Sequence, residues 1–113
     1  MSVQSILAEL TNKVNQSPEI LAGMNTVFQF DISGDDQGTF QVKIQDNQAV
    51  FTNEAKEEPK ATFVLSDKNF VKLVEGNLNP TTAFMMGKIK IKGDLSAAMK
   101  LQSLLKAYQG GGV

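Results

Sequence analysis

The fold is decided by residues 84–108, FMMGKIKIKGDLSAAMKLQSLLKAY. Near its start, Ile89 and Ile91 alternate with lysines between two glycines, which predicts a strand over 88–92 with one apolar face. After the second glycine, apolar residues recur at helical spacing up to Tyr108, which predicts a terminal amphipathic helix. Neither element can bury its apolar side alone. Both must therefore pack against the rest of the chain.

The preceding chain carries helical periodicity first and strand periodicity next. An apolar stripe over 3–14 predicts an amphipathic helix, and Ser17-Pro18 predicts the N-cap of a short second helix that ends near Gly23. The strand pattern then appears as apolar residues at every second position. The predicted strands are 28–32, 40–44, 49–53 and 60–65.

Helix signals return between the fourth and fifth predicted strands. Ser66 predicts the N-cap and Gly76 the C-cap of a helix over 67–75. Asn79-Pro80 predicts a further short helix that ends at Gly87. The charged segment 54–59 reads as a solvated connection. The pattern is that of an α+β domain with a single five-stranded sheet and helices mainly on one face, between which an apolar gap can remain.

The residue types that the sequence lacks restrict its possible functions more than the types that it contains. The chain of 113 residues is long enough for one domain, predicted as 1–109 with a flexible glycine-rich tail over 110–113. It has no His, Cys, Trp or Arg, which removes imidazole bases, thiolate nucleophiles and the usual zinc ligands. No catalytic arrangement of Lys, Asp, Glu, Ser or Tyr is evident, so we expect no enzyme activity and no cofactor. The lack of cysteine fits an intracellular compartment.

Charge is distributed unevenly along the chain. Residues 1–59 carry three lysines and nine acidic residues, whereas residues 60–113 carry eight lysines and three acidic residues. The lysines at 88, 90 and 92 alternate along the fifth predicted strand, where they could protect an exposed sheet edge or meet anionic lipid headgroups. With no arginine and few aromatic residues, nucleic acid is not favoured as a partner.

The sequence contains more flexible apolar side chains, methionines above all, than the core of a small domain requires. Met24, Met85, Met86 and Met99, with neighbouring Phe and Leu residues, could fill an irregular core or line an apolar pocket. Gln102 lies beside the apolar stripe of the last helix, where it could orient a ligand or simply be exposed.

Three segments in the second half carry a family resemblance. They are Asn79-Pro80 to Phe84, Gly87 to Asp94, and the Ala98-Met99-Lys100-Leu101-Gln102 run. In this order they resemble the sterol carrier protein type 2 family. The resemblance implies a five-stranded, mostly antiparallel sheet, a crossover after the third strand, and helices over one face. It also implies an apolar tunnel between the layers for fatty acids, fatty acyl-CoA, sterols or phospholipids.

The resemblance also implies site residues and a role. The tunnel residues that it implies are Leu21, Met24, Phe70, Phe84, Met85, Met99, Leu101, Gln102, Leu104 and Leu105. From the lysine row itself, we expect Lys88, Lys90 and Lys92 to contact a lipid headgroup or an anionic membrane. The hypothesis is a non-catalytic, monomeric intracellular lipid carrier. The alternative is a protein-interaction module with a solid core and no ligand cavity. Because the sequence ends in Gly-Gly-Gly-Val, we see no C-terminal peroxisomal signal, and cytoplasm and peroxisome both remain open.

Overall fold

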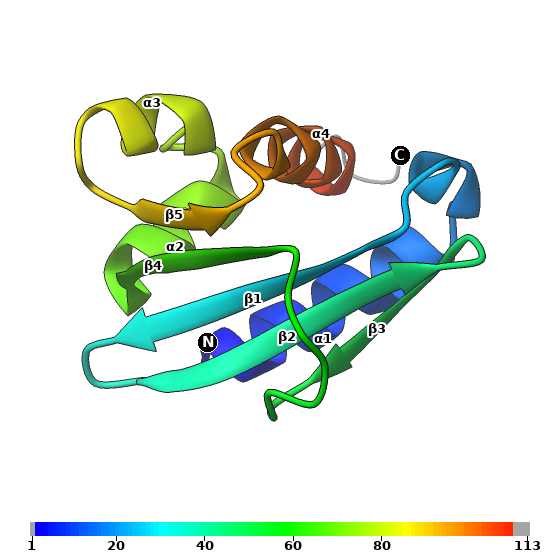
Figure 1. Cartoon of the computed structure of the whole chain (residues 1–113), viewed down its shortest axis with the longest axis horizontal. Coiled ribbons are helices and arrows are strands. Elements are labelled where there is room, and N and C mark those ends of the chain that lie inside the picture. Colours follow the sequence, from blue (N-terminus) through cyan, green and yellow to red (C-terminus); the bar gives the residue numbers. More distant parts are fainter. Residues whose placement is uncertain (1, 110–113) are drawn as a thin grey trace.

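A computed structural model describes residues 2–109, which form one five-stranded sheet with helices packed on one face (Figure 1). The strand order is β3-β2-β1-β4-β5, and every neighbouring pair is antiparallel except β1 and β4, which are parallel. The predicted α+β fold, with a mostly antiparallel sheet, is confirmed. The elements are α1 Val3–Asn15, η1 Pro18–Leu21, β1 Thr26–Ser33, β2 Gly38–Gln45, β3 Gln48–Thr52, β4 Ala61–Ser66, α2 Asp67–Glu75, α3 Pro80–Met85, β5 Lys90–Gly93 and α4 Ala97–Gln109.

The helix ends follow local chemistry, with one exception. Ser66 accepts a hydrogen bond from the backbone N–H of Asn69 at 3.1 Å, and Gly76 takes the left-handed conformation after α2, as predicted. Asn79 caps α3 in the same way. Ser17 takes the predicted N-cap position with Pro18 first in the helix, but its side chain makes no capping hydrogen bond. The short second helix is a single 3-10 turn, η1.

The fifth strand begins two residues later than predicted. The backbone N–H groups of Lys88 and Ile89 both donate to the carbonyl of Ala83 and close the end of α3, so only residues 90–93 pair with β4. At its far end, Gly93 has φ +90°, and a Cβ atom there would lie 2.5 Å from the carbonyl oxygen of Lys60. Glycine is therefore required where β5 leaves the sheet.

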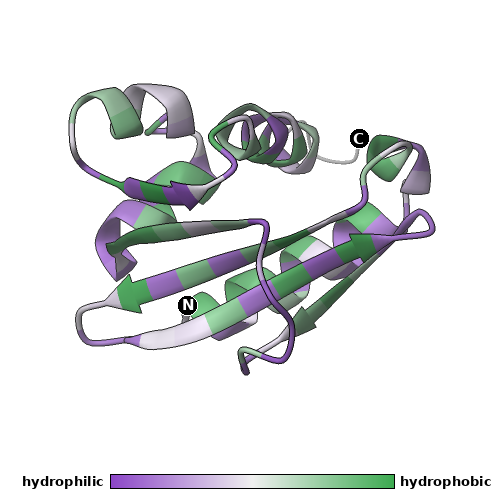
Figure 2. Cartoon of the chain, in the orientation of Figure 1, coloured by the Kyte–Doolittle hydropathy of each residue, from purple (hydrophilic) through white to green (hydrophobic). Residues whose placement is uncertain are grey.

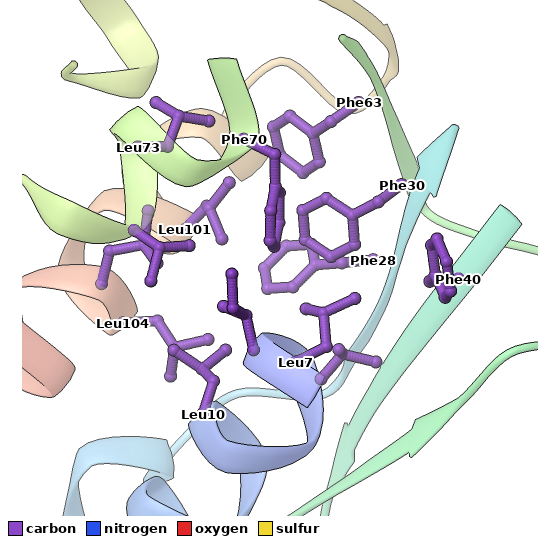
Figure 3. Close-up of a cluster of buried hydrophobic side chains, with 14 of the residues drawn as sticks. Leu7, Leu10, Phe28, Phe30, Phe40, Phe63, Phe70, Leu73, Leu101 and Leu104 are labelled. Atoms are coloured by element: carbon purple, nitrogen blue, oxygen red, sulfur yellow. The ribbon is translucent and has the colours of Figure 1, made fainter. Parts of the chain in front are cut away.

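The core lies between the helices and one face of the sheet. Apolar and polar residues alternate along β1 and β2, as the bands in Figure 2 show, and the apolar set faces the helices. Phe28 and Phe30 on β1 both contact Phe63 on β4, with ring centroids 5.8 and 5.5 Å apart. Phe30 also meets Phe70 of α2 edge to face (Figure 3). These rings hold α2 against the parallel pair of strands.

The connection from β3 to β4 crosses the outer face of the sheet. Strands β3 and β4 run in the same direction with β2 and β1 between them, so residues 53–60 must pass over both (Figure 1). Beneath the loop lies Gln41, which is buried. Its Oε1 accepts the N–H groups of Lys56 and Glu57, and its Nε2 donates to Gln29 and to the carbonyl of Glu57. The predicted solvated connection is exposed in its charged side chains, but its backbone covers the sheet.

Candidate functional site

A small apolar void lies between the two layers of the domain. It measures about 10 Å³, which is at the lower limit of the space that a water molecule needs, and every side chain around it is apolar. Three helices and the sheet contribute to it (Figure 3). The lining residues are Ile6, Leu7 and Leu10 of α1, Phe30 of β1, Phe70, Leu73 and Val74 of α2, and Leu101 and Leu105 of α4.

Two surface hollows share walls with this void. A groove of about 360 Å³ between α1, α2 and α4 is lined by Ile6, Val71, Val74, Glu75 and Tyr108, and Ile6 and Val74 also line the void. A pocket of about 170 Å³ shares Leu73 and Leu105 with it. That pocket is lined by Leu73, Gly76, Leu78, Asn79, Pro80, Gln102, Leu105, Lys106 and Gln109. The void is thus separated from each hollow by side chains that border both spaces.

Polar contacts fasten the helices beside each hollow. At the groove, the Tyr108 hydroxyl donates to Glu9 at 3.0 Å, and the Lys13 ammonium lies 5.1 Å from the centre of the tyrosine ring. Partial burial, together with the hydrogen bond to the Glu9 carboxylate and its charge, raises the pKa of Tyr108. At the pocket, Gln109 Nε2 donates to the carbonyls of Leu73 and Val74, both at 3.1 Å. The end of α4 is therefore tied to both α1 and α2.

Six of the residues predicted as tunnel lining lie in or against the core. Phe70, Leu101 and Leu105 line the void itself. Leu21 and Leu104 are buried in the core but do not border the void, and Met24 is half-buried against it. The half-buried Gln102 lines the pocket and contacts the Thr81 hydroxyl at 3.2 Å, which joins α4 to α3.

The structure does not bring the other predicted residues to the void. Phe84, Met85 and Met99 are 38%, 79% and 69% exposed. Lys88, Lys90 and Lys92 are exposed on and beside the edge strand β5. Conversely, six of the nine void-lining residues were not predicted as tunnel residues, although their helix and strand faces were predicted to be apolar. The apolar stripe of α1 and the apolar face of α2 were the signals that could have identified most of them.

None of the helices within residues 2–109 is long and apolar enough to cross a bilayer.

Comparison with known proteins identifies the domain. Residues 5–106 match the model of the SCP-2 sterol transfer family. Hydroxysteroid dehydrogenase-like protein 2 of Bos taurus is 35% identical over 94 residues, which cover 82% of this chain but 22% of the relative. The corresponding Danio rerio protein is 35% identical over 91 residues, again across 22% of its length. The chain therefore spans about a fifth of the length of these relatives.

Solved structures show the same fold. The sterol carrier protein domain 2 of Helicoverpa armigera superposes with a TM-score of 0.75 at 28% identity, covering 94% of this chain and 86% of that domain. For Sterol Carrier Protein 2 of Yarrowia lipolytica the TM-score is 0.74 at 22% identity, covering 96% and 91% of the two chains. For palmitated SCP2L2 of Aedes aegypti it is 0.71 at 22% identity, covering 93% and 95%. With its family match and its fold in agreement, the chain belongs to the SCP-2 sterol transfer family.

Proposed function

We propose that this chain is a non-catalytic lipid carrier that holds the apolar part of its ligand between the helices and the sheet. The observation that carries the proposal is the wholly apolar void, which is walled off from two surface hollows by shared side chains such as Val74 and Leu73. Apolar cavities lack polar partners for water, and they bind apolar ligands instead. A lipid would enlarge this space by moving helices that pack against it.

Fatty acids, fatty acyl-CoA, sterols and phospholipids are the ligand classes that we propose. The family assignment supports lipid transfer in general, and the Aedes aegypti relative was studied in a palmitated form. Burial of an acyl chain contributes about 0.8 kcal/mol per methylene group. A chain of about a dozen methylenes therefore gains about 10 kcal/mol, from which the costs of association and of opening the core are subtracted.

Opening requires movement around α2, because this helix supplies walls toward both hollows. Val74 faces the groove side and Leu73 the pocket side. Helix α4 is the opposing wall, and its last turn is held by the contacts of Tyr108 and Gln109. In our proposal the carrier acts as a monomer inside the cell, in the cytoplasm or the peroxisome, and exchanges its lipid when these peripheral helices separate.

A second candidate is a protein-interaction module with a solid core. The observation in its favour is the small size of the void, about 10 Å³. On this alternative, the relation between the void and the hollows has no functional meaning. Purified protein would then bind no lipid, however the core is repacked.

The test is titration with a fluorescent fatty acid, followed by competition with unlabelled fatty acid, acyl-CoA and cholesterol. Leu101→Ala enlarges the void and should speed uptake severalfold, although it destabilises the fold by about 2–5 kcal/mol. Ile44→Ala is the matched control, because Ile44 is fully buried on β2 but does not border the void. It should cost similar stability and leave uptake as in the wild type.

The competition order would identify the ligand class. If folded wild-type protein and folded Leu101→Ala both fail to bind saturably, the carrier proposal is wrong and the solid-core alternative stands.

A further inference from the structure

Exposed apolar side chains gather at one corner of the molecule. Within residues 2–109, six large apolar side chains are exposed, and five of them belong to α3, to the start of α4 or to the connections on either side of β5. These three elements lie together in Figure 1. The sixth, Val50, lies on β3 at the opposite edge of the sheet. We call the five the apolar corner: Phe84, Met85, Met86, Leu95 and Met99, with exposed fractions from 38% to 79%. A cluster of exposed apolar side chains marks a surface that binds a protein, a membrane or a ligand.

Buried anchors hold the apolar corner in place. Ala83 and Ile89 flank its first three residues and are 0% and 2% exposed. The backbone N–H of Lys88 donates to the carbonyl of Ala83 at 2.8 Å, and Asn69 Nδ2 donates to the carbonyl of Lys88 at 3.4 Å. Three consecutive apolar side chains are therefore presented outward from a segment fixed at both ends. Nothing in the fold of the described residues covers them.

The surroundings of the apolar corner are basic. Residues 80–109 contain five lysines and a single acidic residue, Asp94. The Asp94 carboxylate accepts hydrogen bonds from Ser96 and lies 3.9 Å from the Lys100 ammonium, so its charge is already engaged. Lys88, Lys90 and Lys92 are exposed beside the apolar corner. The surface thus combines apolar side chains with an excess of positive charge.

We propose that the apolar corner is the surface by which the protein docks on an anionic lipid bilayer. Its Met, Leu and Phe side chains enter the boundary between headgroups and acyl chains, while the lysines meet anionic headgroups. Lysine is depleted at protein–protein interfaces, whereas Lys88, Lys90 and Lys92 are exposed beside this apolar corner. The proposal rests on the proposed function, since a carrier that exchanges lipids must reach a bilayer. It also gives Phe84, Met85 and Met99 a role outside the void.

The test is co-sedimentation with vesicles of phosphatidylcholine, with and without roughly a third of phosphatidylserine. Met86→Gln with Leu95→Gln removes apolar surface without changing charge, and it should lower partitioning at least about tenfold. Lys90→Gln with Lys92→Gln should also lower partitioning about tenfold, but only on the vesicles that contain phosphatidylserine. Val50→Gln and Lys72→Gln are the matched controls, because both side chains are exposed elsewhere, and they should partition as the wild type does.

Fatty-acid binding in solution separates the two proposals. The Met86→Gln, Leu95→Gln variant should bind fluorescent fatty acid as the wild type does, since neither side chain borders the void or its hollows. If wild-type protein binds fatty acid but ignores vesicles, or if Val50→Gln loses as much partitioning as the paired glutamine variant, the docking proposal is wrong and the carrier proposal survives. Vesicle binding that depends on the apolar corner, without fatty-acid binding, would overturn the carrier proposal alone.

Discussion

Tyr108 donates a hydrogen bond to Glu9, so the end of the last helix is tied to the first helix across 3.0 Å. Lys13, one turn further along α1, lies over the same ring. The tyrosine also forms part of the groove wall, next to the side chains of Ile6 and Val74 that border the void. The contact is therefore placed to hold closed the side of the core that faces the groove.

Removal of this hydroxyl should accelerate lipid exchange. Tyr108→Phe keeps the ring beneath Lys13 but removes the donor to Glu9, at a cost of about 0.5–1.5 kcal/mol in folding stability. We expect the dissociation rate of a fluorescent fatty acid, measured by stopped-flow displacement, to rise severalfold. Glu9→Gln retains an acceptor oxygen and should give an intermediate rate. An unchanged dissociation rate in both variants would show that the contact is not a gate.

The same residue gives a pH prediction with a direct optical readout. Tyr108 is the only tyrosine and there is no tryptophan, so phenolate absorbance reports this site alone. Burial and Glu9 raise its pKa above the ordinary value of about 10. The stability that Tyr108 contributes should therefore be intact below pH about 10 and be lost as the pH rises through the raised pKa. Unfolding of wild type and Tyr108→Phe, compared across this range, should converge at high pH.

The route into the core can be tested at the shared walls. Val74→Phe places a larger side chain between the groove and the void, and the groove has about 360 Å³ to receive it. The groove wall is mainly apolar, whereas the pocket carries Asn79, Gln102, Lys106 and Gln109. We therefore expect Val74→Phe to slow fatty-acid association severalfold. Leu78→Phe, on the pocket side, is the control, and fatty acid should associate with it at the wild-type rate. If Leu78→Phe slows association and Val74→Phe does not, the lipid enters from the pocket.

Local signals in the sequence were sufficient for most of the fold. Helix α2 begins after Ser66 and ends at Gly76 as predicted, because capping depends on residues within one turn. Strands β1 and β2 form where apolar and polar residues alternate, because successive side chains of a strand point to opposite faces of the sheet. Ser17 and Pro18 begin the short helix η1 where predicted, but the expected side-chain capping bond of Ser17 does not form.

The site was harder to predict because it depends on which surfaces meet in space. Met99 lies beside the apolar stripe of α4, where periodicity cannot decide between core and solvent, and the structure places it outside. The void is instead completed by α1, whose stripe looked like ordinary core. Gln41 reads as an outward-facing strand residue. Only the path of the crossover loop, which no local pattern encodes, explains its burial.

The buried amide beneath the crossover loop should be important for stability. Gln41→Ala leaves the loop N–H groups of Lys56 and Glu57 without their acceptor, so we expect a loss of about 1–3 kcal/mol in chemical denaturation. Cleavage of the loop by a protease should become faster. Gln45→Ala, at the exposed end of the same strand, should change the free energy of unfolding by less than about 0.5 kcal/mol. Equal effects in the two variants would contradict this role.

Two glycines with the same backbone handedness should respond differently to substitution. Gly87 and Gly93 have φ +76° and +90°, but a Cβ on Gly87 meets nothing within 4 Å, whereas one on Gly93 would lie 2.5 Å from the Lys60 carbonyl oxygen. Gly87→Ala should cost about 1–2 kcal/mol of stability from backbone strain alone. Gly93→Ala should cost more and loosen β5. Similar melting temperatures for the two variants would exclude this clash as the cause.

The parallel pairing of β1 and β4 has a consequence for the order of folding. Strands β1, β2 and β3 are joined by short turns, whereas Phe28 meets Ala61 only after residues 53–60 have crossed the sheet. The pairing of β1 with β4 is thus the least local step of sheet formation, and such steps are slow because loop closure precedes their contacts. We expect the meander to assemble first and β4, β5 and their helices to join it later. The core that would receive the lipid is therefore completed only when β1 pairs with β4.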